Sequence, residues 1–477
     1  MAEFRSDSWR HTPSFMVLAS FSLVVIGAVI WTGIASTLFV AVALLGTAVL
    51  LAALLPAAGV AGVLAALPTM YELHPMPRGQ FSLLELAILV AAAGTFLNVL
   101  AQLRNRSWDV IRSLVVPAQI VVPVLLLALA AGVSLLTIAD PAHRAESLRE
   151  VRTVIVEPLI FLATARLVLR DTIWRNWVGA SFILVGLVIA IGALVQVAFN
   201  LGGVAAGSVL RATGPYTHPN NLALFLERTL LFTVAVAFLK PRWWPVWGIV
   251  AIQLLGVGAT YSRGALLAVA ISIGFLMLLL GMHRWLGALA IGGLVVGGMA
   301  FLLAPERLID AGGSGSEPTR FALWRSSVRM ALDHPVFGVG PDQFLYQYWR
   351  RYVEPIGWPE RYSSHPHNLV LDVWLRLGVV GLTAFATLIV GLIWWVRRSF
   401  DCIRGDIWSM GGIAALVGGL AHGMVDQGFF LPDLATMTWL FVSFLITTAT
   451  AKPPGFSSPP ARPRNEPIGR VDASRTF

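Results

Sequence analysis

Long apolar runs recur along most of the chain and constrain its fold more than any other feature. A bilayer core about 30 Å thick needs about 20 consecutive apolar residues in helical form to be crossed, and the runs have this length. Charged residues make up 12% of the sequence and hydrophobic residues 57%, whereas soluble domains carry about 25% charged residues. A barrel strand would alternate apolar with polar residues, which these runs do not do. The sequence therefore predicts an all-α integral membrane protein.

Polar breaks divide the apolar runs into about 12 to 14 expected transmembrane helices. At Pro56 the pattern fits either one long kinked helix or two short helices. We expect helices near residues 14–31, 34–55, 57–70, 81–100, 114–138, 153–169, 177–199, 218–239, 243–260, 264–282, 285–304, 366–396, 408–425 and 428–450.

The runs divide the chain into five parts. These are N-terminal transmembrane helices (1–140), central transmembrane helices (141–304), a large extracytoplasmic loop (305–365), C-terminal transmembrane helices (366–450) and a disordered cytoplasmic tail (451–477). If the N-terminus lies inside, Lys and Arg concentrate in the inner segments, as the positive-inside rule requires. The net charge of +9 then fits contact with anionic membrane lipids. No basic stripe with interleaved aromatic residues indicates a nucleic-acid partner.

Residues 319–333, within the long loop, are expected to form a helix on the outer membrane surface. Arg325 and Arg329 lie on one face of this helix. The other face carries apolar residues at helical spacing: Phe321, Trp324, Val328, Ala331 and Leu332. Such a helix either covers a cavity or only anchors the loop.

Two polar clusters precede helices on the predicted outer side. The first, R-A-T-G-P-Y-T-H-P-N-N, holds Arg211, His218 and Asn220, and its Asn and His residues, which flank a Pro at a helix start, also suit simple helix capping. Arg211 is the only charge in a loop of small residues, so capping does not explain it. The second cluster, T-Y-S-R-G, places Arg263 at the junction of two helices, where contact with lipid headgroups is an alternative.

Two further clusters lie in the long loop and directly after it. Arg320 belongs to the expected surface helix. The motif S-S-H-P-H-N-L-V-L-D leads into the next helix with four polar residues: His365, His367, Asn368 and Asp372. Asp372 precedes Arg376 by one helical turn, and a charge inside a bilayer helix costs about 2.5–3.5 kcal/mol, so we expect the two to pair.

These residue types together suit a lipid-diphosphate substrate. The planar Arg side chain binds phosphate oxygens through two donors, and His titrates near neutral pH, as a general base requires. Two His separated by one residue, with no obvious acidic third ligand, are a weak metal signal. We therefore expect no metal and no cofactor. The single cysteine, Cys402, permits neither an intramolecular disulfide nor a cysteine-based metal site.

The ordered motifs of the chain resemble the O-antigen ligase and polymerase superfamily, which are bacterial inner-membrane glycosyltransferases. The series covers roughly residues 150–450 and reads R-A-T-G-P-Y-T-H-P-N, T-Y-S-R-G-A, R-F-A-L-W-R, D-H-P-V-F-G-V-G-P, H-P-H-N-L-V-L-D and L-G-V-V-G-L. The resemblance implies a GT-C-like fold and a periplasm-facing active site. It also implies an undecaprenyl-diphosphate-linked glycan donor and a glycan or lipid acceptor, such as lipid A-core.

The resemblance also implies roles for single residues. Arg211 and Arg263 match the arginines expected to hold the diphosphate, and Arg320 is a third candidate. His367 matches the loop histidine because it directly precedes Asn, while His365 is the competing candidate for the catalytic base. The supporting residues are His218, Asn220, Asn368 and Asp372. The implied reaction is one inverting displacement, in which the His takes a proton from the acceptor hydroxyl and Arg residues stabilise the departing diphosphate.

Other functions remain open at this stage. A polymerase and a ligase of the same superfamily would use the same donor chemistry. A transporter or flippase would also carry intramembrane charges such as Glu157, Glu227 and Asp426. A transporter, however, places its polar groups near the midplane rather than at the outer surface. A scaffold protein would leave the Arg and His clusters unexplained.

Overall fold

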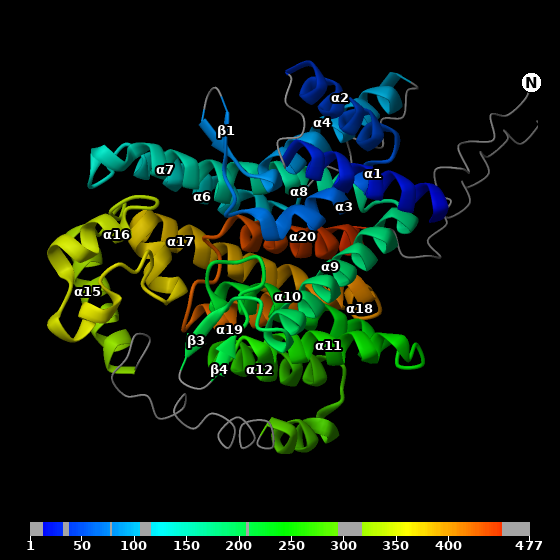
Figure 1. Cartoon of the computed structure of the whole chain (residues 1–477). Coiled ribbons are helices and arrows are strands. Elements are labelled where there is room, and N and C mark those ends of the chain that lie inside the picture. The colour runs from blue at the N-terminus through cyan, green and yellow to red at the C-terminus, as the bar shows by residue number, and fades with distance from the viewer. Residues whose placement is uncertain are drawn as a thin grey trace, which may run out of the picture.

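The structure is a computed structural model that describes residues 13–31, 38–76, 79–104, 116–206, 209–293 and 317–450. Within these residues it is a bundle of helices with two short hairpins (Figure 1). Five of the described helices are long and apolar enough to cross a membrane alone, and seven shorter apolar helices accompany them. The predicted all-α membrane fold is confirmed.

The first half of the described chain contains eight α-helices. They are α1 (Pro13–Trp31), α2 (Leu38–Leu54), α3 (Pro56–Ala66), α4 (Leu83–Arg104), α6 (Ala118–Ser134), α7 (Arg144–Glu150), α8 (Glu157–Val168) and α9 (Thr172–Ala198). Two antiparallel hairpins pair β1 (His74–Met76) with β2 (Gly79–Phe81) and β3 (Val204–Ala206) with β4 (Val209–Arg211).

The second half contains nine further α-helices, and residues 286–293 are also helical. The nine are α10 (Pro219–Leu239), α11 (Pro245–Ala259), α12 (Arg263–Leu279), α15 (Glu317–Asp333), α16 (Phe344–Gln347), α17 (Leu369–Arg398), α18 (Phe400–Ile403), α19 (Ile407–Gly423) and α20 (Pro432–Thr450). Single turns of 3₁₀- or π-helix lie at η2 (Leu67–Thr69), η3 (Pro141–His143), η4 (Val151–Val156), η5 (His283–Trp285), η6 (Tyr348–Tyr352) and η7 (Pro355–Glu360).

The expected helices agree with the described ones, with one exception near residues 285–304. That helix lies mainly outside the described residues, as do 305–316 and the tail 451–477. At Pro56 the chain forms two helices, because α2 ends at Leu54 and Pro56 opens α3. Proline is tolerated there, since the first turn of a helix has no partner for its missing N–H. With 11 residues, α3 rises only about 16 Å and is too short to cross the bilayer alone.

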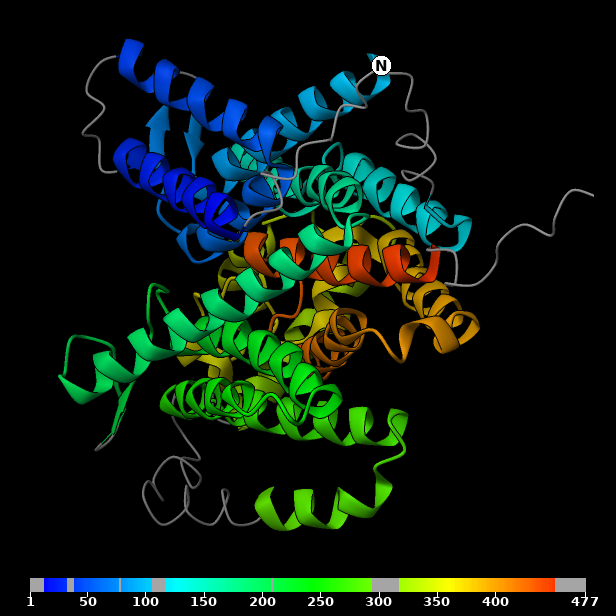
Figure 2. The same ribbon diagram turned by 90° about the vertical axis from the view of Figure 1, so that its right-hand side faces the viewer.

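Two helices form the centre of the bundle. The most apolar stretch of α10 is 89% buried and that of α20 is 83% buried, whereas that of α9 is 39% buried. A helix that is hydrophobic all round belongs in a protein interior, and α10 packs against α9, α11, α12 and α19. Figure 2 shows α9 running obliquely across this core. An outer helix such as α9 leaves much of its apolar surface exposed.

The long loop is folded at one end of the bundle, beside the start of α17 (Figure 1). Its segment 333–341 attaches to α17 through a backbone hydrogen bond from Val339 N to Leu375 O, 2.7 Å long. Gly378 interrupts the helical conformation of α17 with φ +67°. Gly338 has φ +71°, and a Cβ at this position would collide with the Leu375 carbonyl. The glycines of the V-F-G-V-G and L-G-V-V-G motifs therefore allow the loop to dock.

Helix α15 confirms the helix expected at 319–333, but its apolar faces differ in part from the prediction. Arg325 and Arg329 share Glu354 as an ion-pair partner, at 2.6 and 2.8 Å. Ala331, expected on the membrane-facing stripe, is buried, because the inner face packs with Leu323 against the rest of the loop. Three other members of the predicted stripe are exposed, namely Phe321, Val328 and Leu332.

Candidate functional site

The first polar motif forms a rigid loop between the β3–β4 hairpin and α10. Gln196 Oε1 accepts hydrogen bonds from the backbone N–H groups of Thr213 and Gly214, each 2.9 Å long. Gly214 adopts φ +56°, which suits glycine because it has no side chain. The backbone N–H of Ala212 donates to Ala259 O at 2.9 Å. The loop is therefore held by α9 on one side and by the end of α11 on the other.

Arg211 is positioned by this loop and connects to the second half of the chain. Its Nε donates to Thr260 O at 2.8 Å, and its Nη2 donates to Asn220 Oδ1 at 2.9 Å. Asn220 Nδ2 in turn donates to Asp426 Oδ2 at 2.8 Å. Of the two residues considered as helix caps, His218 caps α10 by accepting from Asn220 N at 3.2 Å, whereas the Asn220 side chain does not cap it. The Asn220 side chain instead bridges an arginine and a carboxylate.

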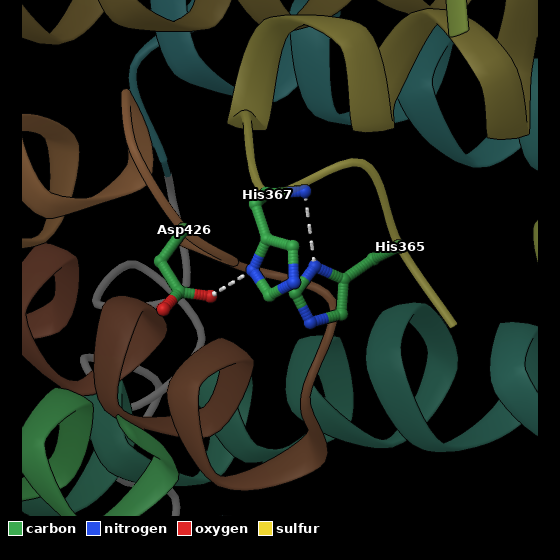
Figure 3. A group of neighbouring side chains, drawn as sticks. All are labelled: His365, His367 and Asp426. Atoms are coloured by element: carbon green, nitrogen blue, oxygen red, sulfur yellow. Dashed lines mark hydrogen bonds and ion pairs between the residues drawn. The ribbon is translucent and has the colours of Figure 1, made fainter. Parts of the chain in front are cut away.

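His367 forms a side-chain hydrogen bond with Asp426, and the two come from different segments (Figure 3). His367 lies just before α17, and Asp426 lies in the turn between α19 and α20. The distance from His367 Nδ1 to Asp426 Oδ1 is 3.0 Å. His367 Nε2 lies 3.5 Å from Ser363 Oγ. The backbone N–H of His367 donates to His365 Nδ1 at 3.2 Å. Both candidate histidines therefore belong to one cluster.

The backbone at His367 is strained. Its φ is +51°, in the left-handed region that residues other than glycine rarely adopt. The next residue, Asn368, caps α17 by accepting from Leu371 N at 3.1 Å and donates from Nδ2 to Met424 O at 3.0 Å. These bonds tie the start of α17 to the turn that carries Asp426. Strain of this kind persists where the surroundings impose it, and it concentrates at functional sites.

The electrostatics of the cluster assign different charges to its members. Burial alone would raise the pKa of the Asp426 carboxyl, but the charge and hydrogen bond of His367 hold this pKa well below its usual value. Burial, followed by the neighbouring His367, lowers the pKa of His365 well below its usual value. Burial and the charge of Arg211 also lower the pKa of His218. At neutral pH, Asp426 is therefore ionised and His365 is neutral.

A buried ionic group lies behind the Asp426 turn. The backbone carbonyl of His422 accepts a hydrogen bond from Asp426 N at 3.0 Å. The ring Nδ1 of His422 lies 2.6 Å from Glu227 Oε2. Arg228 pairs with Glu227 at 3.2 Å and donates from Nη2 to Gly428 O at 2.8 Å. Glu227 and Arg228 thus form a buried pair, and its contacts with His422 and Gly428 brace the turn at both ends.

Arg263 and Arg320 are less closely connected to the histidines. Arg263 is exposed at the first turn of α12, and Arg320 is partly buried on α15. Within the described residues, no hydrogen bond or ion pair joins either arginine to the histidine cluster. A Cβ at Gly264, next to Arg263, would lie 2.7 Å from His422 Nε2. This contact places the start of α12 against the group that supports Asp426.

Asp372 belongs to a different network. It accepts from Arg376 Nε at 2.8 Å, and Arg376 also pairs with Glu150. All three side chains are largely inaccessible. The expected pairing of Asp372 with Arg376 is present, and it joins α17 to α7. We therefore place Asp372 in the framework that carries the site rather than in the site itself.

Asp426 is the site residue that sequence reasoning missed as a partner of histidine. It was counted only among the intramembrane charges. The sequence pattern that could have indicated Asp426 as a site residue is weak. It is one carboxylate in the short polar break between the apolar runs at 408–425 and 428–450. It lies 59 residues after His367, and no local pattern joins the two.

The same cluster fits the donor set of a metal ion. One ligand atom each of His365, His367 and Asp426 lies within 4.8 Å of the others. Imidazole nitrogen and carboxylate oxygen are ligands that Zn²⁺ accepts. The prediction of no metal rested partly on a missing acidic ligand, and Asp426 supplies one. The geometry thus suits either a histidine base oriented by a carboxylate or a bound metal cation. A chelator that removes metal ions distinguishes the two, because only a metal-dependent site would lose activity.

Comparison with known families finds one matching segment of the chain. Residues 248–386 match the family described as O-antigen ligase. No curated protein matches the chain. The matched segment includes Arg263, Arg320 and both histidines, whereas Arg211 and Asp426 lie outside it. The predicted resemblance to the O-antigen ligase and polymerase superfamily is confirmed, and the match supports a function of that general kind.

Proposed function

We propose that this O-antigen ligase-like chain is a membrane glycosyltransferase. It moves a glycan from an undecaprenyl-diphosphate-linked donor to a surface acceptor, either lipid A-core or the end of another glycan. The site faces the periplasm from the bacterial inner membrane. The observation that carries the proposal is the His367–Asp426 pair, linked through Asn220 to Arg211.

His367 is the proposed general base. The ionised Asp426 orients its ring through Nδ1, so that Nε2 takes the proton of the acceptor hydroxyl. His365 suits this role less well, because its Nδ1 accepts the backbone N–H of His367 and its lowered pKa makes it a weak base. His365 instead supports the strained backbone at His367.

The arginines are proposed to hold the diphosphate. Thr260 and Asn220 fix the guanidinium of Arg211, and a fixed planar cation suits phosphate oxygens. Arg263 stands at the N-terminus of α12, where the helix dipole also favours an anion. Arg320, which belongs to α15, is proposed as a third contact to the diphosphate.

The reaction is a single displacement. The acceptor oxygen forms a bond to the anomeric carbon, the bond from that carbon to the phosphate oxygen breaks, and the hydroxyl proton passes to His367. The diphosphate leaves with the bonding electron pair and is stabilised by Arg211 and Arg263. Attack from the face opposite the leaving group inverts the anomeric carbon.

The arrangement of charges favours an enzyme over a transporter. A transporter would present intramembrane charges along a pathway near the midplane. Here Glu227, Arg228 and Arg376 are buried and paired inside the bundle. The histidine cluster instead lies at helix ends, since His365 and His367 precede α17 and Asp426 lies between α19 and α20.

Glycan transfer in reconstituted vesicles tests the proposal. Wild type is compared with His367→Ala, His365→Ala and Arg211→Ala, each with lipid A-core or a second lipid-linked glycan as acceptor. We expect His367→Ala to lose about 10²- to 10⁴-fold in turnover while it still binds donor. Arg211→Ala should weaken both turnover and donor binding. Full activity of His367→Ala would refute the mechanism, and loss of wild-type activity with EDTA would favour a metal ion.

A further inference from the structure

The first turn of α12 leaves two backbone donors free. Ser262 caps the helix, and its Oγ accepts a hydrogen bond from Ala265 N at 3.4 Å. The first N–H groups of any helix have no acceptor within the helix. Among the described residues, no hydrogen bond engages the backbone N–H of Arg263 or of Gly264. These two N–H groups lie at the positive end of the helix dipole, where an anion is favoured.

A buried histidine side chain reaches the same turn from α19. His422 is 1% exposed, and its ring Nδ1 lies 2.6 Å from Glu227 Oε2. The other ring nitrogen, Nε2, makes no hydrogen bond or ion pair with any residue that the structure describes. A Cβ at Gly264 would lie 2.7 Å from this Nε2. The imidazole therefore points at the first turn of α12, and the glycine of the T-Y-S-R-G motif leaves the space beside Nε2 open.

The turn that precedes α12 is strained, and it also holds Arg211. Tyr261 has φ +51°, in the left-handed region that a tyrosine rarely adopts. Ser262 N donates to Thr260 Oγ1 at 3.2 Å, and the Thr260 carbonyl accepts from Arg211 Nε at 2.8 Å. Backbone strain persists where the surroundings impose it, and it concentrates at ligand sites. The guanidinium of Arg211 is thus bonded to the chain three residues before the free N–H of Arg263.

We infer that His422 is a further ligand of the donor diphosphate, which it binds together with the backbone at the start of α12. The inference rests on the proposed function, because that function supplies the diphosphate. One phosphate accepts from His422 Nε2 and from the N–H groups of Arg263 and Gly264, beside the guanidinium of Arg211. A histidine between the Glu227 carboxylate and a phosphate oxygen carries a proton on each ring nitrogen, because both neighbours are anions. Glu227 therefore makes Nε2 a donor and fixes the direction in which it points.

Two replacements of His422 separate the roles of its two ring nitrogens. The amide of asparagine reaches about as far as Nδ1, so His422→Asn keeps a donor to Glu227 and loses the group beside Gly264. The amide of glutamine reaches about as far as Nε2, so His422→Gln keeps a donor at α12 and loses the contact with Glu227. If His422 served only to brace the fold, its contact with Glu227 would matter most, and Asn would be the milder change in every assay. The inference instead predicts that Gln is the milder change for ligand binding and Asn the milder change for stability.

The first measurement is the binding of undecaprenyl diphosphate without glycan to the full chain in lipid nanodiscs. We expect His422→Asn to weaken this binding at least about tenfold, because a hydrogen bond between charged groups is lost. His422→Gln should weaken it less, while thermal melting should show the opposite order of the two variants. Wild-type affinity of His422→Asn, or an equal loss of affinity in both folded variants, would overturn the inference.

Gly264→Ala tests the same contact without changing His422 or Glu227. Its methyl group covers Nε2 and should also weaken the binding of undecaprenyl diphosphate at least about tenfold. The control is Gly258→Ala on α11, where a Cβ meets no atom within 4 Å, and it should bind like wild type. Wild-type affinity of Gly264→Ala would overturn the inference even if neither His422 variant folds.

The outcomes for the inference and for the proposed function can be told apart, because the binding assay needs no catalysis. If the variants lose affinity in the predicted order but wild type transfers no glycan, the inference stands and the proposed function fails. If wild type transfers glycan while His422→Asn and Gly264→Ala bind undecaprenyl diphosphate as tightly as wild type does, the proposed function stands and the inference fails.

Discussion

Replacing Asp426 by Asn tests the central pair of the site. Asp426 accepts from His367 through Oδ1 and from Asn220 through Oδ2. Asparagine offers one oxygen and one NH₂ group, so one of these two donors must lose its acceptor. The change keeps the size of the side chain and removes the charge that orients His367.

The expected loss follows from the bond that is weakened. A hydrogen bond to a charged group contributes about 1.5–3 kcal/mol, and each 1.36 kcal/mol is a factor of ten in rate. Asp426→Asn should therefore lower kcat about 10- to 150-fold. Because Asp426 contacts His367 directly and Arg211 only through Asn220, kcat should fall more than the KM of the donor rises.

A double-mutant cycle shows whether Asp426 acts through His367. In the His367→Ala background, Asp426→Asn should cost less than about twofold, because no base remains to be oriented. The control is Asp406→Asn at the other end of α19, where Asp406 caps the helix and pairs with Arg175 at 3.3 Å. Asparagine caps equally well, so activity should persist. Equal costs of Asp426→Asn in both backgrounds would refute the reasoning.

Three further predictions concern other residues. Because the pKa of His365 is lowered in the folded protein, its protonation opposes folding at low pH. The contribution of neutral His365 to the free energy of unfolding should be fully present above about pH 6.5 and should fall by at most about 1.4 kcal/mol per pH unit below it. Thermal melting between pH 7 and 5 should therefore show a smaller loss of stability for His365→Gln than for wild type. Gly338→Ala should lose at least about 1–2 kcal/mol because of its positive φ and the Leu375 carbonyl, whereas Gly405→Ala, which has open space, should melt like wild type. Arg211→Lys should raise the donor KM about tenfold or more, since Lys lacks the planar geometry that Thr260 and Asn220 hold; an unchanged KM would contradict a diphosphate role.

Local patterns explain why the helices were predictable. Apolar runs long enough to cross a bilayer specify helices without knowledge of their neighbours, because the backbone must form its hydrogen bonds within each segment. The break at Pro56 was ambiguous for the same local reason, since proline suits both a kink and a first turn. In the structure Pro56 lies in the first turn of α3, and this helix packs against α1, α4 and α9.

The site was predictable only in part. His365, His367 and Arg211 stand out as polar residues between apolar runs, and their chemistry indicated a base and a phosphate ligand. The sequence left both His218 and Asn220 as possible caps of α10, and only the three-dimensional arrangement shows that His218 is the cap. Likewise, the burial of Ala331 depends on what lies beside α15.

The sequence by itself determined the membrane class, the helices and the residue types of the site, because each depends on short-range composition and spacing. Only the tertiary structure decided which residues act together. Asp426 meets His367 from 59 residues away and Asn220 from 206 residues away. Such pairs form where helix packing brings the ends of α10, α17 and α19 together, and packing depends on the shapes of whole helices rather than on any local motif.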